Sequence, residues 1–129
     1  MFEKIKALSK LNGVSGDEDQ VRNWIISQIA PYCQYQVDNL GNIICLKKGM
    51  IIPNKKLMIS AHMDEVGLIV TNVTEDGLLK FATVGGVDDR VILGRAVNLY
   101  RSGLTGVIGT KAFHQQSSKE RETTVKAED

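Results

Sequence analysis

The sequence has little of several features that define specialised classes of protein. It contains two cysteines, two prolines and two histidines in 129 residues, and only 5% of its residues are aromatic. Two cysteines without metal-site spacing are too few for the disulfide framework of a small secreted domain. We therefore expect Cys33 and Cys45 to be free thiols in a cytoplasmic protein.

The chain also lacks an excess of charge and a long apolar run. Its formal net charge is +1, so electrostatics give no reason to expect nucleic acid or an anionic membrane as a partner. No apolar stretch approaches the roughly 20 residues of a membrane span, and the N-terminus does not resemble a signal peptide. Hydrophobic and charged contents of 43% and 24% are those of a globular domain, or of part of a larger one.

Two helices are predicted in the first 31 residues. Phe2, Ile5 and Leu8 recur at helical spacing, which indicates a short helix that ends near Asn12 and Gly13. The segment 15–18 has the form of a capping box, with Ser15 as N-cap and Glu18 reaching back to it. The helix that it opens should stop around Pro31.

The remainder of the chain has the pattern of strands and turns. The segment Asp38–Gly41 is a turn by composition. Two helices, a hairpin and a strand begin an α/β layer arrangement, and the short strands after Gly67 suggest a β-rich module. Residues 115–129 are polar and predict a mobile loop or tail. The expected strands are Gln34–Val37, Asn42–Leu46, Leu57–Ala61, Leu68–Val73, Leu78–Val84, Ala96–Tyr100 and Gly106–Thr110.

The strongest local signal is a histidine that follows an apolar run, with a carboxylate two residues later. Residues 57–61 predict a buried strand that delivers His62 and Asp64 at its carboxyl end, where α/β sheets place ligands. A metal-bound imidazole usually donates its other N–H to such a carboxylate. The pattern is unspecific alone, because a histidine at a strand end can be structural and a catalytic zinc ion needs about three protein ligands.

Five segments together resemble one family. In this order and at this spacing they are similar to the M42 metallo-aminopeptidases, the glutamyl or deblocking aminopeptidases that are often labelled endoglucanase-like. The resemblance covers residues 5–114. The segments are Leu11–Gly16, Val37–Asn42, Ser60–Gly67, Gly85–Asp88 and Gly106–Lys111.

The resemblance implies an α/β fold with two parts. Residues 1–67 would be the start of a three-layer αβα zinc-peptidase-like catalytic domain. Residues 68–129 would be a small β-rich insertion domain, used for dimerisation in the family and incomplete here. Family members are cytoplasmic hydrolases that remove N-terminal residues from peptides, and they self-associate into dimers and tetrahedral dodecamers.

The resemblance also implies a metal centre. A complete subunit would hold two divalent metal ions, with zinc or cobalt favoured. His62 would ligate one of them and Asp64 would orient His62, while a glutamate would act as general base for the bound water.

Most of that centre has no counterpart in this chain. In the family the bridging Asp, the general-base Glu and the remaining ligands follow the insertion domain. His114, the only other histidine, aligns with the insertion and is given no metal role, and Glu65 is given none because adjacent strand residues face opposite ways. Asp88 and Asp89 are expected in a capped turn with Arg90 as ion-pair partner. We therefore expect the chain to be inactive alone, with an exposed apolar face that favours oligomers or a complementary chain.

Two other functions are compatible with the sequence. One is a non-catalytic assembly module that retains the family fold. The other is a glycosidase, which would need two carboxylates facing each other across a bond. Nothing in the sequence selects such a pair from the 15 acidic residues.

Overall fold

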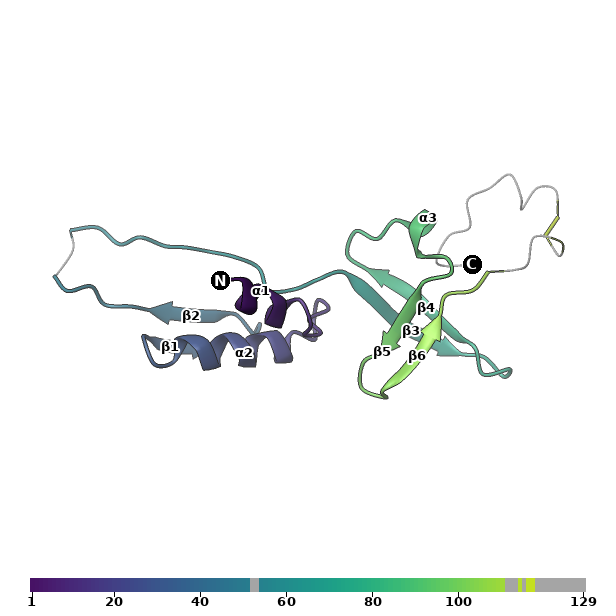
Figure 1. Ribbon diagram of the computed structural model, residues 1–129, viewed down its shortest axis with the longest axis horizontal. Coiled ribbons are helices and arrows are strands. Elements are labelled where there is room, and N and C mark those ends of the chain that lie inside the picture. Colours follow the sequence, from purple (N-terminus) through teal and green to yellow (C-terminus); the bar gives the residue numbers. More distant parts are fainter. Residues whose placement is uncertain (52–53, 111–113, 115, 118–129) are drawn as a thin grey trace. The chain divides into compact units, whose positions relative to one another are not determined.

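The computed structural model describes residues 1–51, 54–110, 114 and 116–117, and the chain divides into two compact units. The first unit spans Met1–Glu65 and the second Val66–Asp129. Among the described residues, the first unit has two helices and one hairpin, and the second has two hairpins with a short helix (Figure 1). Most of the predicted tail, residues 115–129, lies outside the described residues.

The first unit begins with helices α1 (Phe2–Leu8) and α2 (Asp19–Ile29). Helix α2 ends before Pro31, as predicted. Helix α1 ends at Leu8 and not near Gly13, because the next amides form tighter turns. The Lys10 N–H donates to the Ala7 carbonyl and the Leu11 N–H to the Leu8 carbonyl, each three residues back.

The predicted capping box is wrong. Helix α2 takes Glu18 as its N-cap residue, with no side-chain cap. The Glu18 Oε1 instead accepts from the Gly16 N–H at 2.6 Å, and the Ser15 hydroxyl donates to the distant carboxylate of Asp64. Helix α2 begins at Asp19, four residues after Ser15, so the Ser15 oxygen is not placed to accept from the first N–H groups of the helix.

Strands β1 (Gln34–Val37) and β2 (Ile43–Leu46) form an antiparallel hairpin in the predicted region. Its turn is also confirmed. The Asp38 carboxylate accepts from the N–H groups of Leu40 and Asn42 at 3.0 and 2.9 Å. Gly41 has φ +85°, a conformation that glycine adopts without steric cost.

The prediction of free thiols is wrong, because Cys33 and Cys45 form a disulfide. Cys33 directly precedes β1, and Cys45 pairs with Tyr35 in the hairpin register. Hairpin pairing therefore brings the two Cα atoms to 6.3 Å, within the range that a disulfide spans. The predicted hairpin already implies this proximity, because the turn between its strands sets which residues lie opposite each other.

The prediction of a buried strand at 57–61 is also wrong. Within the described part of the chain, these residues belong to no strand and make no backbone hydrogen bond. Leu57, Met58 and Ile59 are 88%, 87% and 87% exposed. An extended segment becomes a strand only when another strand satisfies its N–H and C=O groups. The apolar side chains of this segment are therefore exposed in the described structure.

The second unit consists of two hairpins. Strands β3 (Gly67–Val73) and β4 (Leu79–Val84) pair antiparallel with an irregularity between Val70 and Asn72, and β5 (Ala96–Leu99) pairs with β6 (Leu104–Val107). Strand β6 was expected at 106–110. The turn at 100–103 brings Leu104 opposite Leu99, so pairing begins two residues earlier and leaves Ile108 buried beyond the strand.

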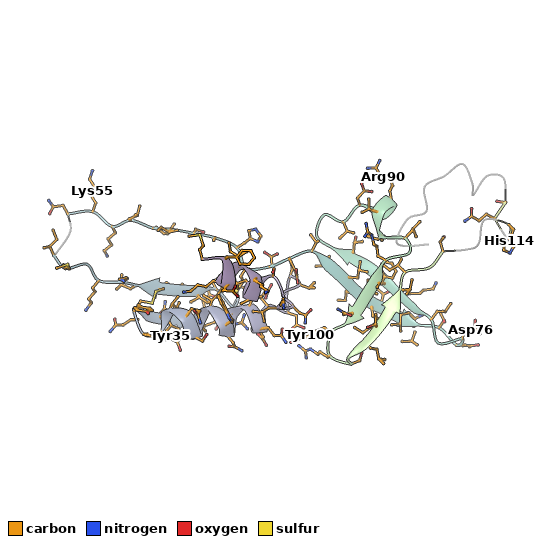
Figure 2. The ribbon with its side chains drawn as sticks, viewed as in Figure 1. Tyr35, Lys55, Asp76, Arg90, Tyr100 and His114 are labelled. Carbon is orange, nitrogen blue, oxygen red and sulfur yellow. A yellow bond between two sulfur atoms is a disulfide. The ribbon has the colours of Figure 1, made fainter. Side chains whose placement is uncertain are left out.

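A four-residue helix, α3 (Asp89–Ile92), lies between the hairpins and confirms the expected capped turn. The Asp88 carboxylate accepts from the Arg90 N–H at 3.0 Å and pairs with its guanidinium at 2.6 Å (Figure 2). The Arg90 side chain, and then its N–H, lower the pKa of Asp88 to about 2. None of the helices in the described residues is long and apolar enough to cross a membrane.

Candidate functional site

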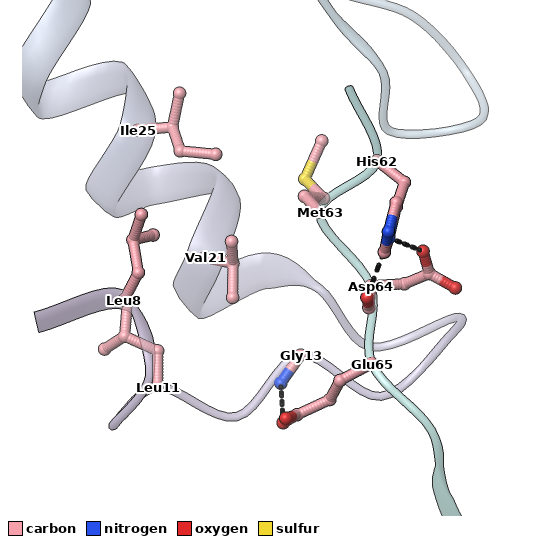
Figure 3. Close-up of a pocket in the computed structure, with 9 residues that line it drawn as sticks. All are labelled: Leu8, Leu11, Gly13, Val21, Ile25, His62, Met63, Asp64 and Glu65. Atoms are coloured by element: carbon pink, nitrogen blue, oxygen red, sulfur yellow. Dashed lines mark hydrogen bonds and ion pairs between the residues drawn. The ribbon is translucent and has the colours of Figure 1, made fainter. Parts of the chain in front are cut away.

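The candidate site is built where the loop before α2 meets the segment that carries His62. Val14 and Glu65 form an isolated parallel β-bridge. The Glu65 N–H donates to the Gly13 carbonyl at 2.7 Å, and the Ser15 N–H donates to the Glu65 carbonyl at 3.3 Å. The Glu65 Oε1 also accepts from the Gly13 N–H at 3.1 Å (Figure 3). These bonds hold the end of the extended segment in one register.

Gly13 permits the close approach of these two segments. A Cβ atom at this position would lie 2.7 Å from the Cγ2 of Val21 and 3.4 Å from the Met63 carbonyl oxygen. Val21 is the buried apolar residue of this unit, at 7% exposure, and its branched side chain has little freedom to move. Apolar side chains and the His62 segment line a shallow hollow here, formed by Leu8, Leu11, Gly13, Val21, Ile25, His62, Met63, Asp64 and Glu65 (Figure 3).

The His62 ring is held through one nitrogen. Its Nδ1 lies 3.0 Å from the carbonyl oxygen of Asp64 and 3.0 Å from the Asp64 Oδ1. Both partners are acceptors, so the geometry assigns the proton of the neutral ring to Nδ1. The Nε2 lone pair is then available to a ligand, and the His62 side chain is 85% exposed. This is the arrangement that a metal-binding imidazole needs.

Asp64 is held from two sides. One carboxylate oxygen faces His62, and the other accepts from the Ser15 hydroxyl. The Ser15 hydroxyl bond, followed by the His62 contact, lowers the pKa of Asp64 below its ordinary value. Asp64 is therefore ionised at neutral pH and can act as the acceptor for His62.

The described residues do not by themselves complete a metal site. Within the part of the chain that the structure describes, no group of three or more His, Cys, Asp or Glu residues could hold a metal ion. The Glu65 carboxylate accepts a hydrogen bond from the Gly13 backbone N–H. His62 fits as one ligand through Nε2, with Asp64 as its orienting partner, and further ligands would have to come from other residues.

Sequence reasoning brought His62 and Asp64 together correctly but missed Ser15. The pattern assigned its hydroxyl to the start of α2, whereas the structure places it on Asp64, 49 residues away. A local motif gives no signal for a contact of that separation. The repeated small residues of the Gly13–Gly16 loop indicate close backbone approach, but not which segment approaches.

Solved structures define the class. A TET aminopeptidase from Thaumarchaeota archaeon SCGC AB-539-E09 matches with TM-score 0.87 and 34% identity, covering 99% of this chain and 36% of that one. The TET1 peptidase of Pyrococcus horikoshii, described as assembling into a tetrahedron or a large octahedral shell, matches with TM-score 0.79 and 38% identity, covering 98% and 38%. This chain is therefore a mixed α/β protein with the fold of part of the TET aminopeptidases.

The family follows from the sequence comparisons. The family model for M42 glutamyl aminopeptidases matches residues 41–129. A putative aminopeptidase of Acetivibrio thermocellus is 39% identical over 109 residues, covering 84% of this chain and 32% of the relative. The chain belongs to the M42 glutamyl aminopeptidase family, as its motifs predicted. It spans about a third of the length of the relatives that it matches.

Proposed function

We propose that this chain supplies one metal ligand, His62, and its orienting carboxylate, Asp64, to the centre of a dinuclear metal-dependent aminopeptidase. The observation that carries the proposal is the His62 ring, whose Nδ1 is engaged by Asp64 and whose Nε2 bonds to none of the residues that the structure describes. Membership of an aminopeptidase family gives the reaction class. The substrate would be a peptide with a free N-terminal residue.

The residues of this chain would act by orientation. Asp64 would keep the proton on Nδ1 and raise the basicity of Nε2, so that His62 binds as a neutral imidazole. Bound zinc or cobalt ions would lower the pKa of a water molecule toward neutrality and polarise the scissile carbonyl. The other ligands and the general base would lie in the part of the relatives that this chain does not cover. The chain alone is therefore proposed to be inactive.

The finer architecture is part of the same proposal. Residues 1–67 would begin the three-layer catalytic domain, and residues 68–129 would belong to the β-rich insertion domain that mediates dimerisation. The assemblies described for the TET1 peptidase support self-association of the complete subunit. A cytoplasmic location stays a prediction.

A chimera tests this function. The chain would replace the matched third of the Acetivibrio thermocellus relative, and metal content and hydrolysis of aminoacyl p-nitroanilides would be measured. We expect about two ions per subunit and metal-dependent turnover. The 129-residue chain alone should retain no stoichiometric metal after desalting and should show no turnover.

Histidine variants make the test specific. In the chimera, His62→Ala should remove metal and turnover together, because it deletes a ligand. His114→Ala is the matched control, since His114 is exposed and lies outside the candidate site. Full activity of the His62→Ala chimera would overturn the proposal.

A non-catalytic assembly module is the second candidate function. It is favoured by the exposed side chains of Leu57, Met58 and Ile59, which would suit burial against another chain. A chimera that folds and assembles but shows no turnover with either zinc or cobalt would favour this candidate.

A further inference from the structure

The Asp64 carboxylate has a separate partner on each oxygen. Oδ1 faces Nδ1 of His62 at 3.0 Å, and Oδ2 accepts from the Ser15 hydroxyl. The three side chains therefore form one continuous hydrogen-bonded series, Ser15 to Asp64 to His62. Its first member comes from the loop before α2, and the other two come from the extended segment 49 residues later.

The backbone fixes Ser15 in this place independently of its side chain. The Ser15 N–H donates to the Glu65 carbonyl, and the adjacent bridge joins Val14 to Glu65. A substitution that removes only the hydroxyl would keep these contacts. The contribution of the hydroxyl can therefore be separated from the folding of the loop.

Asp64 has freedom that the hydroxyl restricts. Its side chain is 41% exposed, and in the described structure it is held by Ser15 and His62. A carboxylate at such a position exchanges among staggered rotamers unless hydrogen bonds select one. The rotamer selected here presents Oδ1 to His62.

We propose that Ser15 is a positioning residue that fixes the Asp64 carboxylate and thereby holds His62 in the Nδ1–H form with Nε2 free. The importance of that form for metal binding rests on the function proposed above, whereas the hydrogen-bonded series itself does not. The Ser15 hydroxyl bonds to the Asp64 carboxylate and not to the His62 ring. It acts through Asp64.

The direct test is the tautomer of His62 in the metal-free 129-residue chain, measured by long-range proton–nitrogen NMR. The spectrum is simple, because the sequence contains two histidines and His114→Ala assigns the other ring. The measurement is made at mildly alkaline pH. We expect the Nδ1–H form to predominate in the unmodified chain.

Three serine variants test the role of the hydroxyl. Ser15→Ala should lower the Nδ1–H population by about half or more, because Asp64 is freed and only its backbone carbonyl stays as a fixed acceptor. Ser15→Thr keeps a hydroxyl and should restore the population. Ser27→Ala is the control, since the Ser27 hydroxyl donates to the Trp24 carbonyl on α2. An unchanged tautomer in Ser15→Ala, with the backbone resonances of the loop preserved, would overturn the proposal.

A second readout uses cobalt affinity in the chimera. Ser15→Ala should weaken cobalt binding by up to about tenfold, less than a substitution of Asp64, because Ser15 is one hydrogen bond further from the ligand. Ser15→Thr should bind as the unmodified chimera does. An inactive chimera with a tautomer shift in the 129-residue chain would reject the proposed function and retain Ser15 as a positioning residue. An active chimera, with no tautomer shift in Ser15→Ala of the 129-residue chain, would retain the proposed function and reject Ser15 as a positioning residue.

Discussion

Gly13 and Glu65 are joined by two hydrogen bonds although they lie 52 positions apart in the sequence. The Glu65 N–H donates to the Gly13 carbonyl at 2.7 Å, and the Gly13 N–H donates to the Glu65 Oε1 at 3.1 Å. Glu65 thus bonds to Gly13 through both its backbone N–H and its side-chain carboxylate. This pair fixes the segment that carries His62 against the loop before α2.

Removing the side-chain half of that pair should destabilise the first unit. Glu65→Ala leaves the Gly13 N–H without its acceptor, and we expect a loss of about 1 kcal/mol in the free energy of unfolding. Urea unfolding followed by fluorescence is selective for this unit, because the one tryptophan, Trp24, lies on α2. Glu75→Ala, in the turn between β3 and β4, is the control and should leave the midpoint unchanged.

Gly13→Ala should destabilise the same unit by steric conflict. The new Cβ would lie 2.7 Å from Val21 Cγ2, and we expect a cost of about 1–3 kcal/mol by the same urea measurement. The conflict is with a side chain, so adding Val21→Ala should produce less destabilisation than the sum of the two single changes. Gly49→Ala, whose Cβ would make an ordinary contact at 3.5 Å, should be nearly neutral. Strictly additive losses of stability would show that Val21 is not the residue with which the new Cβ collides.

Asp64→Asn should weaken metal binding in the chimera while preserving the shape of the side chain. The amide carries no charge to support the His62 N–H, so we expect a loss of roughly 10- to 100-fold in cobalt affinity or turnover. Equilibrium competition with a chelator measures the affinity. Unchanged affinity and turnover would remove Asp64 from its assigned role.

Reduction of the disulfide should destabilise the first unit. The Cys33–Cys45 bond closes a loop of sequence separation 12, for which chain-entropy arguments give about 2–4 kcal/mol. Trp24 fluorescence in urea, with and without a reductant, measures this difference. The Cys33→Ser, Cys45→Ser double variant should lose its response to reductant. Two alkylatable thiols in the unreduced chain would contradict the pairing.

Asp88 should titrate well below an ordinary aspartate. Its pKa is lowered from 3.8 to about 2 by Arg90. The native state therefore binds this proton less tightly than the unfolded chain does, so the stability that it contributes is complete above about pH 4 and is lost as pH falls toward 2. Carbon NMR of the carboxyl group measures the midpoint. Arg90→Gln should raise it toward the ordinary value, whereas Arg95→Gln, a change at an arginine bonded to the Val91 carbonyl, should not.

Local features were predictable from the sequence, and contacts distant in sequence were not. The turn at Asp38–Gly41 and the capped turn at Asp88 were recovered because nearby side chains satisfy nearby amides. His62 and Asp64 were paired because only one residue separates them. The partner of Ser15 depends on which distant segments meet, and periodicity does not encode that.

The apolar run at 57–61 shows a second limit of prediction from the sequence. Its composition predicts a buried strand. Burial and pairing require a neighbouring strand, and the described residues provide none for it. Composition thus reports what a segment is suited for. The surrounding chain decides whether it is used in that way.

The bridge between Val14 and Glu65 joins the loop before α2 to the segment that carries His62. With the hydrogen bonds among Gly13, Ser15 and Glu65, it holds that segment at a residue three positions from the imidazole. Residues 54–61, which lead to His62, make no backbone hydrogen bond among the described residues. The loop before α2, and not the chain that leads to the histidine, is therefore the part that holds the imidazole in place.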